Sequence, residues 1–360
     1  MKLRICIIIP SFGENMKIKA AVLGSTGYAG AELVRILSGH KDVEIVYLAS
    51  HSYVGKAFSQ IYPGMRGVCD LVLQEDDIDK ASADADVVFM ALPAGLSSKF
   101  TTPELLKRCV VIDIGSDFRI HDLDEYKAWY KVEHYHPELL DEAVYGLVEI
   151  HRDEIKGKRL IANPGCYTTC SIMTLYPLVK NGLIDTGTII IDAKSGTSGA
   201  GRSEKLTSLF CEVNESIKPY GVATHRHTPE IEQELSEAAG KKVTLQFTPH
   251  LVPMNRGILS CCYAKLLPGV TEEDIAAAYS MYKDEPFVRL IDTLPETKYV
   301  KGTNLVDIAW RVDKRTGNVI AMGAIDNLVK GAAGQAVQNM NVAFGLEETE
   351  GLSLAAGCPM

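Results

Sequence analysis

A short apolar segment followed at once by closely spaced glycines is the feature that most restricts the fold of this chain. Residues 18–23 are apolar enough for a buried strand, and residues 29–37 place apolar side chains near helical spacing. Between them lies the turn Gly24-Ser-Thr-Gly27-Tyr-Ala-Gly30. Such glycines permit close backbone approach, and a helix start offers unpaired N–H groups to a phosphate. The order strand, turn, helix predicts a dinucleotide site, with a purely structural turn as the alternative.

The rest of the chain separates into two regions with different strand patterns. In the first, apolar runs at 43–49, 86–92 and 109–114 alternate with helix-like segments, which predicts a parallel sheet covered on both faces. After about residue 163, fewer helices separate the strand candidates, which predicts a mixed or antiparallel sheet. These later candidates are residues 188–193, 243–247, 258–267, 304–312 and 319–324.

Length and pattern together predict two domains. A chain of 360 residues exceeds what one core usually organises. The expected class is α/β, with an N-terminal Rossmann-type domain at 16–163, completed by a C-terminal helix at 327–360, and a second, α+β domain at 164–326. The last good helix, 331–344, is rich in Ala, Gly and Gln, which suits close packing against another domain.

Composition excludes several kinds of partner. The net charge is −9 and no run of Lys or Arg occurs, so we expect neither nucleic acid nor a membrane surface as a partner, and a small metabolite instead. The nine cysteines include no C-x-x-C pair, which predicts no zinc site, no disulfide framework and a reduced, cytoplasmic setting. The apolar residues 3–10 are too brief for a signal sequence. Because Met16 directly precedes the first strand, we interpret residues 1–15 as an alternative start or an extension.

The end of the second predicted strand favours NADP over NAD. An NAD site would normally place Asp or Glu there, against the ribose hydroxyl. Here the chain reads Ser50-His51-Ser52, with Lys56 soon after, and hydroxyls with a cation suit a 2′-phosphate. The residues predicted to bind NADP are Gly24, Ser25, Thr26, Gly27, Tyr28, Ala29, Gly30, Ser50 and Ser52.

Cys166 is the candidate nucleophile. The residues before it, Asn163-Pro-Gly, favour a helix start, and the helical stretch ends near Gly182. A cysteine in the first turn has its thiolate stabilised by the helix dipole and by unpaired amides, which could also hold an oxyanion. The alternative, a small buried hydrophobe, suits the other cysteines considered, which are Cys6, Cys109, Cys170, Cys261 and Cys262.

Two histidines stand apart from the other seven, which are isolated and expected on the surface or in the core. His225 and His227 precede Thr228 and Pro229, a pattern that begins a helix, so both imidazoles should lie near a helix entrance. We expect no metal site here, because histidines at i and i+2 lack the usual further ligands nearby.

Six motifs in order carry a resemblance that covers about residues 17–346. They are GSTGYAG (24–30), SDFR (116–119), NPGCY (163–167), HRHTPEIEQEL (225–235), HLVPMNRG (250–257) and DNLVKGAAGQAVQNMN (326–341). Together they resemble the N-acetyl-gamma-glutamyl-phosphate reductase family, within the wider aspartate-semialdehyde dehydrogenase group. One position departs from the family pattern, because Thr168 stands where proline is often found.

The resemblance implies an NADPH-dependent reduction of N-acetyl-L-glutamyl 5-phosphate to the 5-semialdehyde and phosphate, a step of arginine biosynthesis. It implies a thioester on Cys166 and an acid/base histidine from the 225–227 segment. We favour His225 for that role slightly, with His227 contacting substrate, although the residues alone leave both open. By analogy, Asn327 would approach the nicotinamide, the second domain would carry catalysis and oligomerisation, and the protein would be a homo-oligomer.

An acyl phosphate substrate needs cations and hydrogen-bond donors. Arg119 follows the strand that ends at residue 114, where open parallel sheets bind ligands. The candidates for substrate binding are Ser116, Arg119, Asn163 and Arg202, with Arg256 as a further cation, and each arginine alone could instead form a structural ion pair.

Other functions remain open at this point. Within the class, the alternatives are aspartate-semialdehyde dehydrogenase itself and the reductase of lysine biosynthesis that acts on a carrier-linked aminoadipyl or glutamyl phosphate. The acidic net charge opposes docking of an acidic carrier protein. Outside the class, they are a Cys–His hydrolase or acyltransferase without redox chemistry, which the glycine turn opposes, and a non-catalytic NADP sensor.

Overall fold

The computed structural model describes residues 17–357 and divides the chain into two compact units. The first unit comprises the residues up to His121, Glu133–Asn163 and Gln335–Leu352, and the second comprises Asp122–Val132, Pro164–Gly334 and the residues from Ser353. The expected domains differ from these units in three places, since residues 122–132, 327–334 and 353–357 lie in the second unit. The interpretation of residues 1–15 falls outside the described residues.

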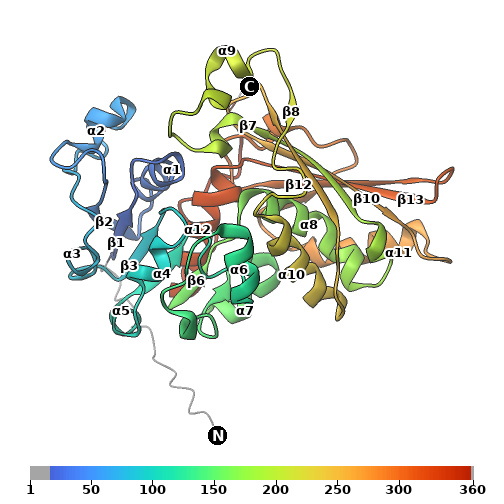
Figure 1. Ribbon diagram of the computed structural model, residues 1–360, viewed down its shortest axis with the longest axis horizontal. Helices are drawn as coiled ribbons and strands as arrows, with labels where there is room; N and C mark the ends of the chain where they lie inside the picture. The colour runs from blue at the N-terminus through green and yellow to red at the C-terminus, as the bar shows by residue number, and fades with distance from the viewer. Residues whose placement is uncertain (1–16, 358–360) are drawn as a thin grey trace, which may run out of the picture. The chain divides into compact units, whose positions relative to one another are not determined.

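The first unit contains a six-stranded sheet in which every pairing is parallel (Figure 1). Every residue of its two central strands, β3 (Val87–Met90) and β4 (Val110–Asp113), is buried, as expected for strands covered on both faces. The predicted parallel sheet is therefore confirmed. In spatial order the strands are β2 (Val43–Leu48), β1 (Ile18–Leu23), β3 (Val87–Met90), β4 (Val110–Asp113), β6 (Leu160–Ala162) and β5 (Val144–Tyr145).

The glycine turn joins β1 to α1 (Tyr28–Leu37), as the sequence predicts. A Cβ on Gly30 would lie 2.3 Å from the carbonyl oxygen of Gly24, so only glycine fits where α1 passes over the turn. The other helical segments of this unit are α2 (Phe58–Ile61), η1 (Pro63–Met65), α3 (Ile78–Ser82), α4 (Leu96–Phe100), α5 (Pro103–Arg108), η2 (Pro137–Leu139) and α7 (Val148–Ile155).

The last helix, α12 (Gly334–Phe344), belongs to the first unit from Gln335 onward. Its buried amides satisfy backbone and side-chain groups of that unit. Gln335 and Asn339 both donate to the Gly146 carbonyl, at 2.7 and 2.8 Å, and Asn339 also donates to Asn163 Oδ1 at 3.0 Å. A C-terminal segment therefore completes the N-terminal unit, and it does so through polar contacts.

The second unit contains a seven-stranded mixed sheet, in which only the pairs β11–β12 and β7–β9 are parallel. The mixed sheet that the sequence predicts is confirmed. In spatial order the strands are β11 (Val288–Leu290), β12 (Val306–Asp313), β13 (Asn318–Ile325), β10 (Ile258–Lys265), β7 (Ile190–Gly196), β9 (Gln246–Val252) and β8 (Lys218–Pro219).

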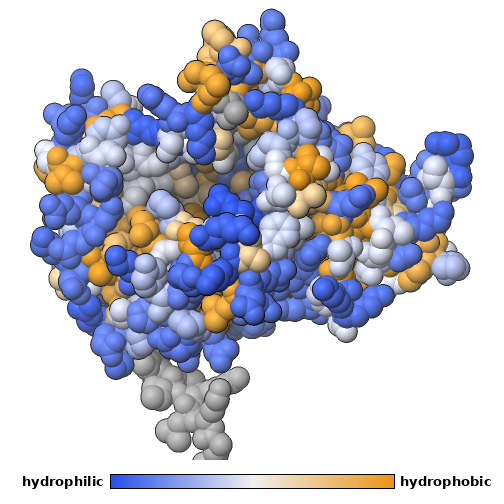
Figure 2. All heavy atoms as spheres, in the orientation of Figure 1, coloured by the Kyte–Doolittle hydropathy of each residue, from blue (hydrophilic) through white to orange (hydrophobic). Residues whose placement is uncertain are grey.

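The central helix of this unit is α8 (Cys166–Lys180), which packs against β10, β13 and α10 (Thr228–Ala239). Every residue from Tyr167 to Val179 is buried, so α8 forms the middle of the core. Apolar side chains gather on the surface over α9 (Phe210–Val213) (Figure 2). The remaining helical segments are α6 (Leu123–Tyr130), α11 (Glu272–Tyr279), η3 (Thr186–Thr188), η4 (Thr197–Ala200), η5 (Leu206–Ser208), η6 (Ser280–Tyr282), η7 (Thr297–Tyr299) and a π-turn, η8 (Val329–Ala333).

Two expectations from the sequence need adjustment. The strand expected at 243–247 lies at Gln246–Val252, because residues 241–245 lead from α10 into the sheet. The helix expected at 331–344 begins as the π-turn η8 and becomes α-helical only at Gly334. Among the residues that the structure describes, no helix has the length and apolarity needed to cross a membrane.

Candidate functional site

The glycine turn of the first unit is fastened to the end of β2. Ser25 donates to the Ala49 carbonyl through both its backbone N–H (3.0 Å) and its hydroxyl (2.8 Å). The buried hydroxyls of Thr26 and Ser50 lie 2.7 Å apart. A Cβ on Gly27, which precedes α1, would meet only the Gly24 carbonyl at 3.6 Å. The turn is therefore held by hydrogen bonds to Ala49 and Ser50, and the backbone at Gly27 has space beside it for a ligand.

The groups at the end of β2 separate into buried and exposed ones. The hydroxyl of Ser50 is buried against Thr26 and forms part of the turn itself. Ser52, His51 and Lys56 are exposed. The Nζ of Lys56 lies 5.7 Å from the ring centroid of Tyr53, a cation–π contact that keeps the lysine near this strand end. Of the predicted 2′-phosphate ligands, Ser52 is available to solvent and Ser50 is not.

The loop after β4 carries two of the predicted substrate residues, Ser116 and Arg119, and both are buried. Arg119 donates from Nη2 to the Ile114 carbonyl at 2.9 Å. Burial and the nearby carboxylate of Asp117 together raise the pKa of Asp113 to about 7, against the opposing effect of the Arg119 charge. Arg119 therefore partly neutralises the carboxylates of its own loop, whatever else it binds.

The other two predicted substrate residues lie in different units. Asn163, at the end of β6 in the first unit, is fully buried and accepts from Asn339, so it contributes to the anchoring of α12. Arg202 lies in the second unit, directly after η4, and is half-buried. Three of the predicted substrate residues, Ser116, Arg119 and Asn163, thus follow the carboxyl ends of β4 and β6. Arg202 lies elsewhere, in the second unit.

In the second unit, Cys166 is the first residue of α8, as the sequence predicts. The Cys166 side chain is half-buried. The preceding residue, Gly165, is the N-cap of α8; its backbone is extended, and it provides no side-chain cap to the helix. The π-turn η8 passes against it, because a Cβ on Gly331 would lie 2.7 Å from the Cys166 Cβ. The thiol therefore lies at a helix start, where the helix dipole favours a thiolate.

A buried carboxylate at this helix start was missed by the sequence analysis. Glu230, from the first turn of α10, accepts from the Gly165 N–H at 2.9 Å and from the Thr168 hydroxyl at 2.8 Å. The same hydroxyl lies 2.6 Å from the Gly165 carbonyl. Glu230 is fully buried, so it links α10 to the turn that carries Cys166. The departure of Thr168 from the family pattern was the available signal.

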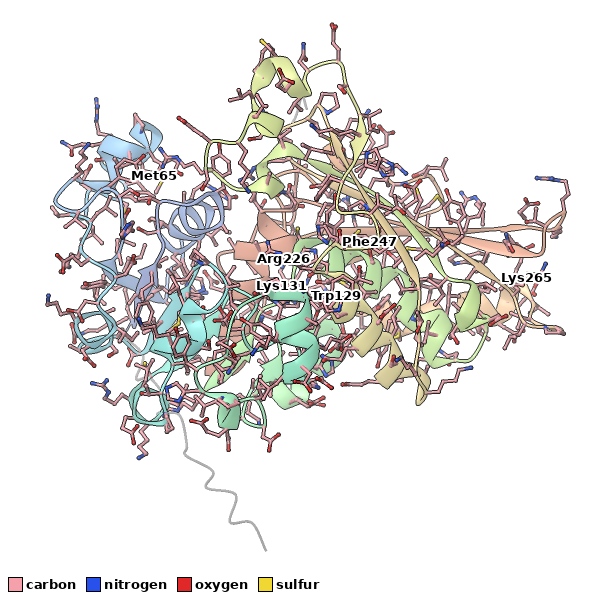
Figure 3. All side chains as sticks on the ribbon, in the orientation of Figure 1. Met65, Trp129, Lys131, Arg226, Phe247 and Lys265 are labelled. Carbon is pink, nitrogen blue, oxygen red and sulfur yellow. The ribbon has the colours of Figure 1, made fainter. Side chains whose placement is uncertain are left out.

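His225 and His227 lie together in an aromatic cluster formed around Tyr167, the residue after Cys166. The Tyr167 ring centroid is 5.7 Å from that of His225 and 6.0 Å from that of His227, and the two imidazoles are 4.9 Å apart. Tyr220 and Phe247, each 5.3 Å from His225, complete the cluster (Figure 3 labels Phe247). The structure thus brings both predicted histidines to the residue next to Cys166.

The cluster changes the protonation of His225. Burial among the rings lowers its pKa to about 4, and the adjacent guanidinium of Arg226 also lowers it. Tyr167 donates to the His250 carbonyl at 3.1 Å, and Tyr220 donates to the Tyr167 hydroxyl at 3.3 Å. His225 is therefore a neutral imidazole at pH 7, held in a defined orientation.

Helix α6 explains why residues 122–132 belong to the second unit. The hydroxyl of its last residue, Tyr130, donates to the Arg226 carbonyl at 3.4 Å, and the Arg226 guanidinium lies 5.4 Å from the Tyr130 ring centroid. Figure 3 shows Arg226 beside Trp129 and Lys131 at the end of this helix. Arg226, the residue between the two histidines, is thus held by Tyr130, which the sequence analysis assigned to the first domain.

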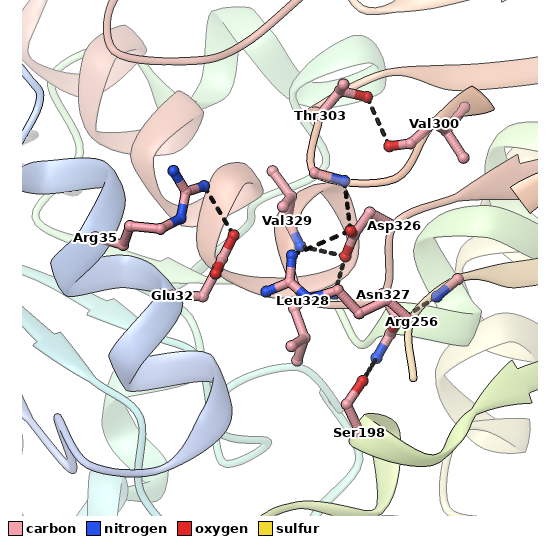
Figure 4. A network of polar contacts seen from close by, with 12 residues as sticks. Glu32, Arg35, Ser198, Arg256, Val300, Thr303, Asp326, Asn327, Leu328 and Val329 are labelled. Carbon is pink, nitrogen blue, oxygen red and sulfur yellow. Dashed lines mark hydrogen bonds and ion pairs between the residues drawn. The ribbon is translucent and has the colours of Figure 1, made fainter. Parts of the chain in front are cut away.

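Asn327 connects two loops of the second unit. Its Oδ1 accepts from the Gly257 N–H at 2.8 Å, and its Nδ2 donates to Ser198 at 3.0 Å. The neighbouring Asp326 is fully buried, pairs with Arg256 at 3.2 Å and accepts from two N–H groups that open η8 (Figure 4). Arg256 therefore has a structural ion-pair partner.

These two units define a class of protein, and comparison with known families gives the same class. Residues 19–158 match the family described as semialdehyde dehydrogenase, NAD binding domain, and residues 166–327 match semialdehyde dehydrogenase, dimerisation domain. Among solved structures, aspartate semialdehyde dehydrogenase II from Vibrio cholerae has a TM-score of 0.68 at 16% identity, covering 91% of this chain and 98% of that one. The NADP-bound enzyme from Candida albicans has a TM-score of 0.64 at 18% identity, with the same coverage. The expected α/β fold with a second α+β domain is confirmed.

Curated relatives narrow the class to one family. N-acetyl-gamma-glutamyl-phosphate reductase from Lachnospira eligens is 56% identical over 95% of this chain and 100% of that protein. The protein of the same name from Campylobacter jejuni is 53% identical over 95% of this chain and 99% of its own. The chain belongs to the N-acetyl-gamma-glutamyl-phosphate reductase family.

Proposed function

We propose that this protein reduces N-acetyl-L-glutamyl 5-phosphate to N-acetyl-L-glutamate 5-semialdehyde and phosphate, with NADPH as the reductant. The observation that carries the proposal is the placement of Cys166 at the start of α8, with both histidine rings packed on the adjacent Tyr167. A thiol at a helix start, beside a neutral imidazole, is the arrangement that an acyl-transferring nucleophile needs. This reaction would place the protein in arginine biosynthesis.

In the first half of the reaction, the Cys166 thiol gives its proton to an imidazole, for which we favour His225, and its sulfur attacks the acyl carbon. Phosphate leaves, and a thioester on Cys166 remains. The negative charge that develops on the carbonyl oxygen would be held by N–H groups of the first turn of α8. His225 suits the base because its lowered pKa keeps it unprotonated at pH 7. His227 then contacts the substrate.

When bound, NADPH supplies the hydride that reduces the thioester. The resulting thiohemiacetal oxyanion collapses to the aldehyde and returns Cys166 to the thiolate. In the first unit, the N–H groups at Gly27 and Tyr28 would hold the pyrophosphate, and the exposed Ser52, His51 and Lys56 would hold the 2′-phosphate. Asn327, which connects two loops of the second unit, would approach the nicotinamide.

The substrate residues follow from position and charge. Ser116 and Arg119, on the loop after β4, and Arg202, after η4, are the donors proposed for the phosphate and the carboxylate. Asn163 would act through the anchoring of β6 and α12. The acting species would be a homo-oligomer, in accordance with the match of residues 166–327 to a dimerisation domain.

The proposal is tested by following NADPH formation in the reverse direction, from N-acetylglutamate semialdehyde, phosphate and NADP. Wild type and Cys166→Ser are compared, and aspartate semialdehyde serves as the control substrate. Turnover of the acetylated aldehyde alone, lost in the variant, supports both the substrate and the nucleophile. Turnover of aspartate semialdehyde instead, or activity that survives the serine substitution, refutes the proposal. If neither aldehyde is turned over, the carrier-linked substrate of lysine biosynthesis replaces it.

A further inference from the structure

Arg226, the residue between the two histidines, is a cation that forms no ion pair with any residue that the structure describes. Three other arginines of the second unit pair with aspartates at 2.6 to 3.3 Å, namely Arg256, Arg289 and Arg315. Arg226 is also exposed, so a ligand in solution has access to it. Its positive charge is therefore not needed to balance a carboxylate among residues 17–357, and it is available to an anionic ligand.

Two tyrosines of α6 hold the Arg226 guanidinium in place. The rings of Tyr126 and Tyr130 stack with centroids 5.1 Å apart and an interplanar angle of 18°, and both residues are buried. The guanidinium lies over the Tyr130 ring, 5.4 Å from its centroid. A guanidinium over a ring face keeps the N–H groups at its edge for an anion, and it loses little freedom when the anion binds. Arg226 is thus pre-organised for a carboxylate, which accepts two parallel hydrogen bonds from an arginine.

The backbone of Arg226 is fixed as well. Its carbonyl accepts from the Tyr130 hydroxyl at 3.4 Å. The turn around Arg226 is closed by the Thr228 N–H, which donates to the His225 carbonyl at 3.0 Å. His225 packs in turn on Tyr167, the residue after the nucleophile. The unpaired cation is therefore held next to the histidine for which we favour the role of base.

We infer that Arg226 binds the α-carboxylate of the substrate and thereby selects N-acylated amino-acid derivatives, an inference that rests on the proposed function. In N-acetyl-L-glutamyl 5-phosphate the α-nitrogen is a neutral amide, so the end of the molecule remote from the acyl phosphate has only a negative charge. In aspartyl phosphate this end also has an ammonium group, which Arg226 repels. Only a short carbon chain separates the carboxylate from the acyl carbon, which suits a cation adjacent to His225. Arg226 thus joins the donors already proposed for the two anionic groups of the substrate.

The test gives each protein two substrates that differ only in this charge. KM and kcat are measured in the reverse direction, with phosphate and NADP, for N-acetylglutamate semialdehyde and for its α-carboxamide, in which a neutral amide replaces the carboxylate. Wild type, Arg226→Gln, Arg226→Lys and the control Lys131→Gln are compared. Lys131 is exposed and is the C-cap of α6, next to Tyr130. Its substitution removes the same charge from the same part of the surface but leaves the guanidinium over Tyr130 in place.

Wild type and Lys131→Gln should prefer the carboxylate over the carboxamide by about tenfold or more in kcat/KM, mainly through KM, and Arg226→Gln should lose this preference. Arg226→Lys keeps the charge without the two parallel hydrogen bonds, so it should retain part of the preference, and it replaces Arg226→Gln if that variant does not fold.

Three results overturn the inference while the proposed function stands. They are a wild type without the preference, a preference that survives in Arg226→Gln, and an equal loss in Lys131→Gln, which would indicate general charge attraction. If wild type turns over neither aldehyde, the proposed function itself has failed and the inference fails with it.

Discussion

The carboxylate of Glu230 accepts a 2.9 Å hydrogen bond from the backbone N–H of Gly165, the residue that precedes Cys166. Because Glu230 lies on the helix that follows the two histidines, one fully buried group joins the nucleophile to the acid/base segment. A carboxylate at a helix start is favourable in itself, and burial makes each of its hydrogen bonds more important. The relative position of Cys166 and His225 should therefore depend on this side chain.

Thr168→Val should loosen this connection. The substitution keeps the volume but removes the hydroxyl that bonds Glu230, so we expect a loss of about 1–3 kcal/mol in unfolding free energy. The rate and the pH profile of Cys166 alkylation should change with it. The matched control is Thr169→Val, since the buried Thr169 hydroxyl has no hydrogen-bond partner among the described residues. Equal effects of the two substitutions would show that Thr168 only fills space.

Two glycines of the phosphate turn should respond differently to alanine. In Gly30→Ala the new Cβ would clash with the Gly24 carbonyl at 2.3 Å, so the unfolding temperature should fall. In Gly27→Ala the Cβ meets only one atom, at 3.6 Å, so the protein should remain stable. Its NADPH affinity should nevertheless fall by about tenfold or more, equivalent to 1.4 kcal/mol. Fluorescence titration with NADPH measures this, and unchanged affinity would refute a ligand at Gly27.

The lowered pKa of His225 predicts a specific pH dependence of stability. The folded state keeps the imidazole neutral down to about pH 4, whereas the unfolded chain binds a proton near pH 6.5. The contribution to stability is therefore complete above pH 6.5 and is lost as the pH falls toward 4. Its size is on the order of 3 kcal/mol. Urea unfolding at pH 7 and pH 5 should show a smaller difference in His225→Gln than in wild type. A difference as large as that of wild type would show that other groups cause it.

Gly331→Ala tests the close packing of η8 on Cys166. Its Cβ would lie 2.7 Å from the Cys166 Cβ, so either the helix start or the π-turn must shift. We expect kcat to fall by about tenfold or more, because small displacements of reacting groups are costly. The control is Gly187→Ala, where the nearest atom is 3.4 Å away and activity should be retained. Full activity of Gly331→Ala would mean that the contact has no part in positioning the thiol.

The sequence predicted those features that depend on local pattern. The strand 18–23, the turn, the helix start at Cys166 and the change from a parallel to a mixed sheet all follow from residues close together in the chain. The grouping of His225 and His227 with Tyr167 required the family resemblance, since His225 lies 58 positions after Tyr167 in the sequence. Glu230 could not be recognised, because an acidic residue in a first turn is common and only the fold shows that it serves another helix.

Two assignments of the sequence analysis show what contacts between distant residues add to local pattern. The expected first domain includes residues 122–132, as does the match to the NAD binding domain, whereas Tyr130 contacts Arg226 and these residues group with the second unit. Ser50 was predicted to bind NADP from its place after β2, and its hydroxyl lies buried against Thr26. In both cases the contact joins residues far apart in the sequence, which local pattern does not register.

The assembly of the first unit from three separate stretches of chain has a consequence for how the protein is made. Gly146 and Asn163 accept hydrogen bonds from α12, whose residues follow the long stretch 164–334 of the second unit in the sequence. During synthesis, the N-terminal unit therefore remains without these bonds until the ribosome has passed Asn339. The usual order, in which an N-terminal domain folds first, does not apply in full here. A chain that ends before α12 would lack the segment that completes its first unit, so truncated products should be targets for proteases.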